Sequence, residues 1–436
     1  MGKIFCRCRQ KVTEAGLQIQ PNKEQRVYYI LLQFSLEIHI FSHLCTKLHD
    51  DLMKVRFIAV FLLLSYLCSA QETDSLTVSQ DSAQSKNIID RVMSLFEYNR
   101  GRTSVKCYPS AGIDPASGIS VGILSLVSIA PKESERKFIR FYRPTSISTM
   151  AQYSTKNWLN LKSDMIIYAS HGVVVNTVLQ YQISPDKFYG IGNDTLNTNP
   201  VKFDMKDLRV SGNVSKEITS TFYLGFTFDI SHRKYASQGM NEDSLDVPAQ
   251  KNNLLIGFGP HFTFDRRDNI NYPTHGEFVT VGVKYFAPHN DDAYSFYSVE
   301  VDARKFITLY KDLILALQGF VGTSEGDMPF YSLFQLGGQS RLRGLSNKYM
   351  YIDKNAVYVQ GELRKHIWNR FSAVIFGGFG NTSPKMSDMR FEGLKYVYGG
   401  GIRFQSDTKN NINLRLDYGR GKFGDSGVYM TMREAF

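Results

Sequence analysis

The side chains that could do chemistry are scattered along this 436-residue chain. None of the nine histidines belongs to a His-Glu-x-x-His pattern, and no Gly-x-Ser-x-Gly or paired-carboxylate motif stands out. His261 and Ser295 could be imagined as a pair like that of outer-membrane phospholipases, but the alternation around His261 points its ring away from the outer wall that such enzymes use. The sequence therefore predicts no enzyme and no cofactor.

Cysteine usage gives no metal site either. The five cysteines form no Cys-x-x-Cys pair, which argues against both a zinc site and a disulfide framework. They are Cys6, Cys8, Cys45, Cys68 and Cys107. The net charge of +10 is a mild excess for this length and gives no specific argument for nucleic acid as a partner.

Composition leaves two classes of protein. A helical membrane protein would show several apolar runs of about 18 or more residues, and none is present. A disordered chain would be poor in aromatic residues, whereas Phe, Tyr and Trp make up 13% of this one. Two classes remain: a large soluble protein, or a transmembrane β-barrel, whose short alternating strands keep mean hydropathy low.

One segment has the parts of a secretory signal peptide. A short apolar run, residues 57–67, follows the basic Met53-Lys54-Val55-Arg56 and precedes Cys68-Ser69-Ala70. Lipid attachment at Cys68 is disfavoured because Leu67 is bulky. A signal needs a free N-terminus, so we expect translation to start at Met53, with 53–70 as signal peptide and 1–52 as an over-extended gene start. The alternative is a buried helix behind a real leader domain.

The remainder of the chain reads mostly as strands. Apolar residues 88, 89, 92, 93 and 96 predict a short amphipathic helix over 85–97, and from 104 onward the apolar period becomes two. The predicted strands are 104–113, 118–130, 144–154, 158–169, 172–184, 201–214, 219–230, 252–265, 277–287, 293–309, 313–323, 355–367, 371–380, 395–405, 411–419 and 427–436. Sixteen strands, with connections that mostly alternate in length, are typical of an all-β, antiparallel outer-membrane barrel over 104–436.

Charged residues sit at alternate positions within these strands. Facing lipid, each would cost about 2–4 kcal/mol at the midplane, so we expect a paired network in the lumen. Its predicted members are Glu362, Arg364, Arg403, Arg415 and Asp417. The last predicted strand carries a pattern that barrel-assembly machinery recognises, namely an aromatic end preceded by alternating residues. Its members are Tyr429, Met430, Met432 and Phe436.

Three stretches resemble the BamA/TamA family of bacterial surface antigen barrels. They are Gln335-Leu-Gly-Gly-Gln-Ser-Arg-Leu-Arg-Gly-Leu345, the segment 264–276 with Asp-Arg-Arg-Asp, and the glycine-rich C-terminal strands from Tyr398 to Phe436. The resemblance implies a sixteen-stranded barrel in the outer membrane of a Gram-negative bacterium. It also implies that the sixth external loop folds back into the lumen.

The resemblance further implies a role for the tip of that loop. Leu342-Arg343-Gly344-Leu345 matches the family's Val-Arg-Gly-Phe/Tyr motif, whose arginine pairs with acidic residues on the inner walls of the twelfth and thirteenth strands. Glu362 matches the first acidic residue, but Gly378 stands where the family has the second. The resemblance therefore implies that only half of the latch is present, with Arg343 coupled to Glu362. The alternative is that Arg343 is an ordinary loop charge.

Residues 71–103 are too few for the periplasmic POTRA domains of barrel-assembling relatives, so the resemblance predicts a POTRA-less form. The helix at 85–97 is expected to lie on the inner leaflet, plug the barrel mouth or touch a partner; a bland amphipathic cap is equally compatible. We expect a factor that helps insert or translocate proteins or lipids. The expected partners are outer-membrane lipids, the machinery that inserts the barrel itself, and unfolded outer-membrane proteins or a periplasmic partner. The alternative is a channel or structural barrel without machinery function.

Overall fold

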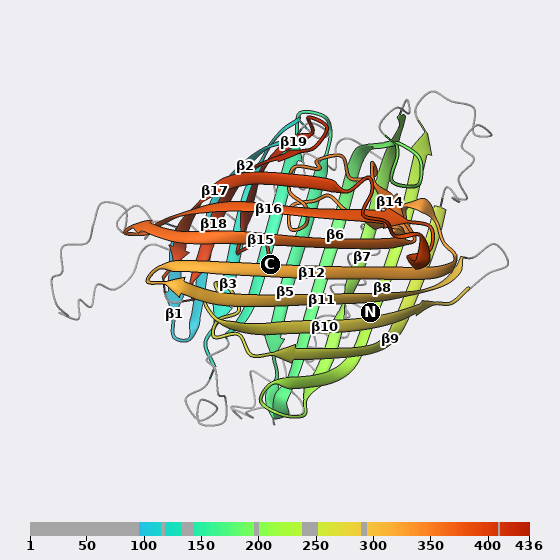
Figure 1. Ribbon diagram of the computed structural model, residues 1–436. Coiled ribbons are helices and arrows are strands. Elements are labelled where there is room, and N and C mark those ends of the chain that lie inside the picture. The colour runs from blue at the N-terminus through green and yellow to red at the C-terminus, as the bar shows by residue number, and fades with distance from the viewer. Residues whose placement is uncertain are drawn as a thin grey trace, which may run out of the picture. The chain divides into compact units, whose positions relative to one another are not determined.

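The computed structural model describes residues 96–114, 118–131, 144–195, 200–237, 252–288, 294–408 and 410–436 (Figure 1). All of them belong to one compact unit, Ser85–Phe436. The predicted signal peptide 53–70, the gene start 1–52 and residues 85–95 of the predicted helix lie outside the described residues. At the end of that helix the prediction is wrong, because Glu97 begins strand β1 (Glu97–Arg100).

Sixteen antiparallel strands of the described chain form the barrel wall, as predicted. They are β2 (Thr103–Asp114), β3 (Gly118–Ile129), β4 (Thr145–Ser154), β5 (Leu159–Tyr168), β6 (Val173–Phe188), β7 (Val201–Glu217), β8 (Phe222–Ser237), β9 (Asn252–Asp265), β10 (Gly276–Phe286), β11 (Ser295–Tyr310), β12 (Leu313–Asp327), β15 (Asn355–Trp368), β16 (Phe371–Ser383), β17 (Lys395–Asp407), β18 (Ile412–Gly421) and β19 (Ser426–Met432). Each pairs with its neighbours in sequence, and the pairing of β19 with β2 closes the ring.

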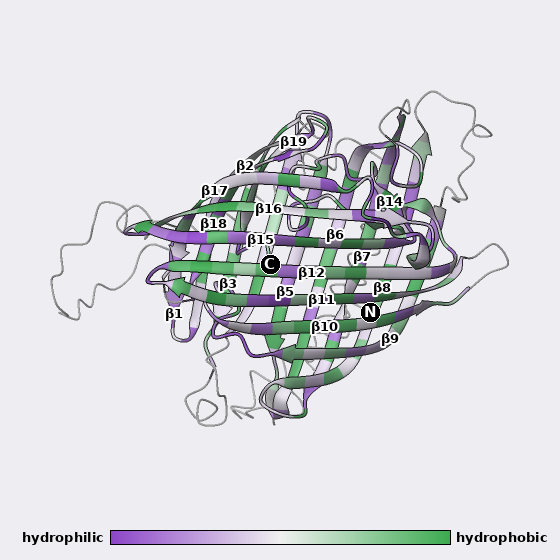
Figure 2. Cartoon of the chain, viewed as in Figure 1, coloured by the Kyte–Doolittle hydropathy of each residue, from purple (hydrophilic) through white to green (hydrophobic). Residues whose placement is uncertain are grey.

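Alternation places opposite chemistry on the two faces of the wall. Along β15, Glu362 and Arg364 are buried while Val359 is exposed, and along β18 Asp417 is buried between exposed Leu416 and Tyr418. Figure 2 shows the resulting alternation of hydrophilic and hydrophobic residues along the strands. A water-soluble sandwich would bury the apolar face, so this arrangement suits a wall with lipid outside and a polar lumen inside. No helix in the described part of the chain is long and apolar enough to cross a membrane.

The two rims of the barrel differ. The turn end carries short connections such as 218–221 and 311–312 together with the 3-10 turn η1 (Ser170–Gly172). The loop end carries the 328–354 loop, in which η3 (Phe330–Ser332) precedes a ribbon of β13 (Phe334–Gln335) and β14 (Ile352–Asp353). It also carries η4 (Met386–Asp388). The 328–354 loop, hereafter the latch loop, descends into the lumen.

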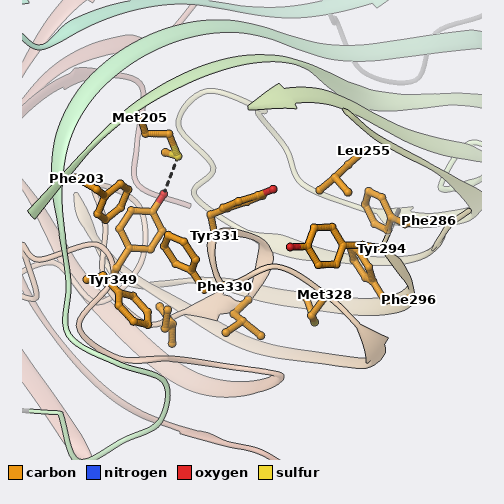
Figure 3. Packing of buried hydrophobic residues seen from close by; sticks show 13 residues of the cluster. Phe203, Met205, Leu255, Phe286, Tyr294, Phe296, Met328, Phe330, Tyr331 and Tyr349 are labelled. Carbon is orange, nitrogen blue, oxygen red and sulfur yellow. Dashed lines mark hydrogen bonds between the residues drawn. The ribbon is translucent and has the colours of Figure 1, made fainter. Parts of the chain in front are cut away.

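An aromatic cluster fills the lumen at the loop end (Figure 3). Phe330 from η3 packs against Phe188, Phe203 and Tyr349, with ring centroids 4.7–5.7 Å apart. Edge and tilted ring contacts of this kind stabilise beyond the area that they bury. The cluster therefore holds the base of the latch loop against the inner wall of β6 and β7.

The closure between β19 and β2 is the weakest junction of the wall. β18 and β19 share seven backbone pairs, whereas β19 and β2 share one, Val428 with Ile113. The predicted last strand, 427–436, ends early because the chain turns at Arg433, which has a positive φ of 67°, and the following residues enter the lumen. We call this junction the seam.

We predict that native-state hydrogen exchange will distinguish the seam from the remainder of the wall. Amides of Met430–Met432, which have no backbone pair with β2, should exchange fastest, whereas the sixteen backbone pairs of β6 and β7 should protect those strands most. Peptide-resolved exchange in detergent or nanodiscs measures this. Equal protection of β19 and β7 would contradict a weak seam.

Candidate functional site: a buried charge network beneath the latch loop

Arg343, at the tip of the latch loop, is completely buried in the lumen. One terminal nitrogen, Nη2, donates to Glu362 Oε1, and the other, Nη1, lies 2.5 Å from Asp417 Oδ2. The guanidinium also lies over the ring of Phe376, 3.7 Å from its centroid. A planar fork between two carboxylates is the geometry that a guanidinium satisfies best, so the loop tip is held by charge as well as by packing.

The structure brings the five predicted lumenal residues into one network. Arg364 Nε donates to Glu362 Oε2 at 2.9 Å, and Arg403 Nη1 donates to Asp417 Oδ1 at 2.5 Å. Arg415 Nε lies 3.5 Å from Asp417 and donates to Thr431, while its Nη2 donates to the carbonyl oxygen of Gln339 in the latch loop. Glu362 and Asp417 each accept from two arginines, and these bonds connect β15, β17, β18 and the latch loop.

Glu434 is a member that the sequence analysis missed. Its carboxylate accepts from Arg403 Nε at 2.7 Å and from the amide of Asn413 at 2.8 Å. It reaches the lumen only because the chain leaves β19 at Arg433, a change of direction that strand alternation cannot foresee. Among the described residues the network thus combines four arginines with three side-chain carboxylates, and Arg364 also donates to the backbone oxygen of Phe436.

The residues predicted as an assembly signal have different surroundings. Tyr429 points inward, and its hydroxyl accepts from the backbone N–H of Gly344 at 3.4 Å. Met430 and Met432 are half-buried in β19. Phe436 is not on the strand but lies inside the lumen with Phe306 and Ala316, where its backbone oxygen accepts from Arg364 at 3.2 Å.

Glycines explain how the loop tip fits. Gly344 has a φ of +125°, and a Cβ there would meet the backbone of Arg420 at 2.7 Å. Its counterpart on the wall is Gly419, where a Cβ would meet the carbonyl oxygen of Arg343 at 2.3 Å. Glycine on both sides allows this close backbone approach, which places Arg343 beside Asp417.

The prediction that Arg343 has only one carboxylate partner is wrong in this geometry. The second carboxylate is Asp417 on β18, while the position of Gly378 on β16 is filled by the latch loop itself. A Cβ at residue 378 would lie 2.8 Å from Leu342 Cδ2 and 2.7 Å from Gln360 Cβ. The inward alternation of Asp417 in Arg415-Leu-Asp-Tyr-Gly419 is the sequence signal that could have identified it.

A polar chamber of about 1010 Å³ occupies the lumen beside the network. Its wall carries paired charges, among them Arg209 with Asp229 and Lys284 with Glu300. Tyr331 and Phe296 of the aromatic cluster line its loop end, and Arg433 and Phe436 line it near the turn end. The described residues contain no group of three or more potential metal ligands.

Comparison with known proteins assigns this architecture to a family. Residues 142–423 match the Omp85 superfamily domain. The chain belongs to the Omp85 superfamily. It is similar to solved structures of BamA from Haemophilus ducreyi lacking POTRA domains 1-3 (14% identity, TM-score 0.48, covering 86% of this chain and 77% of that one) and of CdiB from Acinetobacter baumannii (11%, 0.49, 76% and 60%) and from Escherichia coli (12%, 0.48, 77% and 63%).

Membership confirms the resemblance seen in the sequence. This Omp85 barrel is an outer-membrane protein of a superfamily whose members insert or secrete proteins. The chain spans less than two thirds of either CdiB chain. The POTRA-less interpretation concerns residues 71–103, which the structure describes only from 96 onward, and it stays a prediction.

We predict that Asp417→Asn destabilises this Omp85 barrel more than Arg343→Met does. Asp417 contacts three arginines, so its loss deprives Arg343, Arg403 and Arg415 of a carboxylate. Loss of Arg343 leaves Glu362 paired with Arg364 and Asp417 paired with Arg403. Leaving a buried charge without its partner costs about 3–5 kcal/mol, which is the loss expected for Asp417→Asn. Unfolding in denaturant, followed by heat-modifiable gel mobility, measures both variants.

Asp312→Asn is the matched control, because Asp312 is exposed in a turn with a φ of 61°, which asparagine tolerates. A double-mutant cycle of Arg343→Met and Glu362→Gln should give an interaction free energy above about 0.5 kcal/mol. Additive losses would mean that Arg343 and Glu362 do not couple.

A second prediction concerns Gly378. Gly378→Ala and Gly378→Asp should both lower the unfolding free energy, by about 1–3 kcal/mol for the alanine, because Leu342 and the wall occupy the space that a side chain needs. Restoring the family's acidic residue is thus expected to weaken the latch here. Gly319→Ala on β12, where a Cβ meets nothing within 4 Å, is the control. A stabilising Gly378→Asp would show that the pocket can open for a carboxylate.

Proposed function

We propose that this Omp85 barrel helps insert or translocate proteins at the outer membrane, acting at the seam. The observation that carries the proposal is the combination of one backbone pair at the seam with a latch loop bound to the adjoining strands. Ser346 and Asn347 of the loop donate to Asp425, in the connection between β18 and β19, at 2.8 and 3.2 Å. The latch loop therefore braces the hairpin that forms one side of the seam.

Such an arrangement has a direct mechanical consequence. Because the loop tip binds the inner face of β18 and Tyr429 of β19, the hairpin keeps its place even though β2 contributes little to holding it. Opening the seam exposes unpaired backbone donors and acceptors, which in a bilayer can be satisfied only by another strand. An unfolded outer-membrane protein can supply that strand, as in other cases of strand addition.

Location and sidedness follow from the same proposal. Export by the signal peptide 53–70 would leave the turn end, and with it Phe436, on the periplasmic side and the latch loop entering from outside. We retain Tyr429, Met430, Met432 and Phe436 as the proposed assembly signal. In the folded barrel Tyr429 and Phe436 are buried, so machinery would have to read these residues before the barrel closes.

A channel is the second candidate, and the polar chamber is the observation that favours it. The aromatic cluster argues against a resting pore, because Phe330 and Tyr331 of the latch loop pack together against the wall at the loop end. Planar-bilayer recordings separate the two functions, because a large, stable conductance of the wild-type protein would favour the channel.

The decisive experiment times the folding of an unrelated unfolded barrel protein in liposomes that contain this protein. We predict that the wild type accelerates insertion and that Arg343→Ala reduces the acceleration at least about tenfold, equivalent to about 1.4 kcal/mol in the barrier. Arg341→Ala is the matched control: Arg341 lies two residues earlier in the same loop, donates to Gln335 within the loop, and otherwise only approaches the Phe320 ring at 6.0 Å among the contacts described. Circular dichroism confirms that each variant is folded. Folded wild type without acceleration would contradict the proposal.

A further inference from the structure

A short strand before the barrel occupies part of the seam. β1 (Glu97–Arg100) forms a hairpin with β2 through Gly101 and Arg102, pairing Glu97 with Lys106 and Arg100 with Thr103. The amide of Cys107 donates to the carbonyl oxygen of Phe96 at 3.0 Å, which extends the pairing by one residue. β1 is therefore a strand added to the wall rather than a free leader.

β1 lies on the edge of β2 that faces the seam. The opposite edge of β2 is fully used, because β3 pairs with it over all twelve of its residues. Two strands share the seam edge of β2. β1 pairs with Thr103–Lys106 near the turn end, and β19 pairs only with Ile113 near the loop end. Between them, Pro109 has no N–H to offer a partner strand. The part of the seam edge that can pair best is thus held by β1 and not by the last strand of the barrel.

One charge holds this short strand. Lys106, 5% exposed, places its Nζ 2.7 Å from Glu97 Oε1 and 3.3 Å from Asp407 Oδ2 at the end of β17. The rings of Phe96 and Tyr108 lie 6.2 Å apart. The outer side contributes little, because Tyr98 is half exposed. Four residues held by one buried charge and a few backbone bonds are the kind of element that opens locally without unfolding the remainder.

We propose that β1 is a placeholder strand, which covers the turn-end edge of β2 at rest and is displaced when a strand of an unfolded outer-membrane protein pairs there. This inference rests on the proposed function and adds that β1 competes with the incoming strand for the edge of β2. The contacts of β1 itself indicate the kind of partner. It is an extended segment that places a carboxylate opposite Lys106. The residue next to that carboxylate is aromatic or apolar and faces outward.

A placeholder lowers the apparent affinity for its competitor by the fraction of time that the edge is free. If the edge is free about one tenth of the time, removing β1 raises the apparent affinity about tenfold, and fixing β1 abolishes binding. Both directions can be tested in the full chain, using the same liposome insertion assay.

The releasing variant is Tyr98→Pro. In an antiparallel pair the bonded positions alternate, so the Phe96–Cys107 bond makes Tyr98 a bonded position and leaves the N–H of Asn99 pointing away from β2. Proline at 98 removes a bond to β2, whereas proline at 99 does not, which makes Asn99→Pro the matched control. We expect Tyr98→Pro to raise the insertion rate at limiting client about threefold to tenfold and Asn99→Pro to leave it near wild type.

The locking variant is Asn99→Cys with Ser104→Cys in a Cys107→Ser background. These two positions are directly opposed and not hydrogen-bonded, with Cα atoms about 4.5 Å apart, which suits a disulfide. We expect the oxidised form to lose most of its acceleration and reductant to restore it. An oxidised form as active as the reduced form, or a Tyr98→Pro rate no higher than that of Asn99→Pro, would overturn the placeholder while leaving the proposed function intact. Wild type without acceleration would instead contradict the proposed function, and the placeholder with it.

Discussion

The lumen of this barrel is organised by the need to neutralise a guanidinium that has been taken out of water. Burying an unpaired charge costs several kcal/mol, so Arg343 can be buried in the lumen only where carboxylates are positioned to pair with it. Glu362 and Asp417 provide that position from β15 and β18, and glycines at 344 and 419 let the two backbones approach closely enough. The path of the latch loop and the bracing of the last hairpin both depend on this match.

Local periodicity was sufficient to predict the wall. Fifteen of the predicted strands overlap observed strands closely, since alternation of apolar and polar residues is a property of each strand alone, and the same alternation identified the inward charges on β15, β17 and β18. What it could not identify were relations across the lumen. The pairing of Arg343 with Asp417 depends on which wall residue lies opposite the loop tip, and the family pattern pointed to position 378, which Leu342 fills.

The remaining differences occur where the chain leaves the regular wall. An apolar face over 85–97 indicated helix, but the pairing of Glu97 with Lys106 and of Phe96 with Cys107 makes the end of that stretch a strand, because an available sheet edge outweighs weak helical propensity. The last strand stops at Met432 for a comparable reason. Glu434 finds Arg403 and Asn413 inside the lumen, a better environment for a carboxylate than the lipid-facing or edge positions that a continued strand would give it.

These two departures lie on opposite sides of the same seam, and together they explain why it is weak. A sheet edge in a membrane cannot stay unpaired, so a seam with one backbone pair demands that each edge be covered in another way. On the β2 side, β1 pairs with the four residues at the turn end of the edge. On the β19 side, the strand is shortened to seven residues and the chain after it is withdrawn into the lumen, so that little edge remains to be covered. The barrel thus closes without committing its first and last strands to each other.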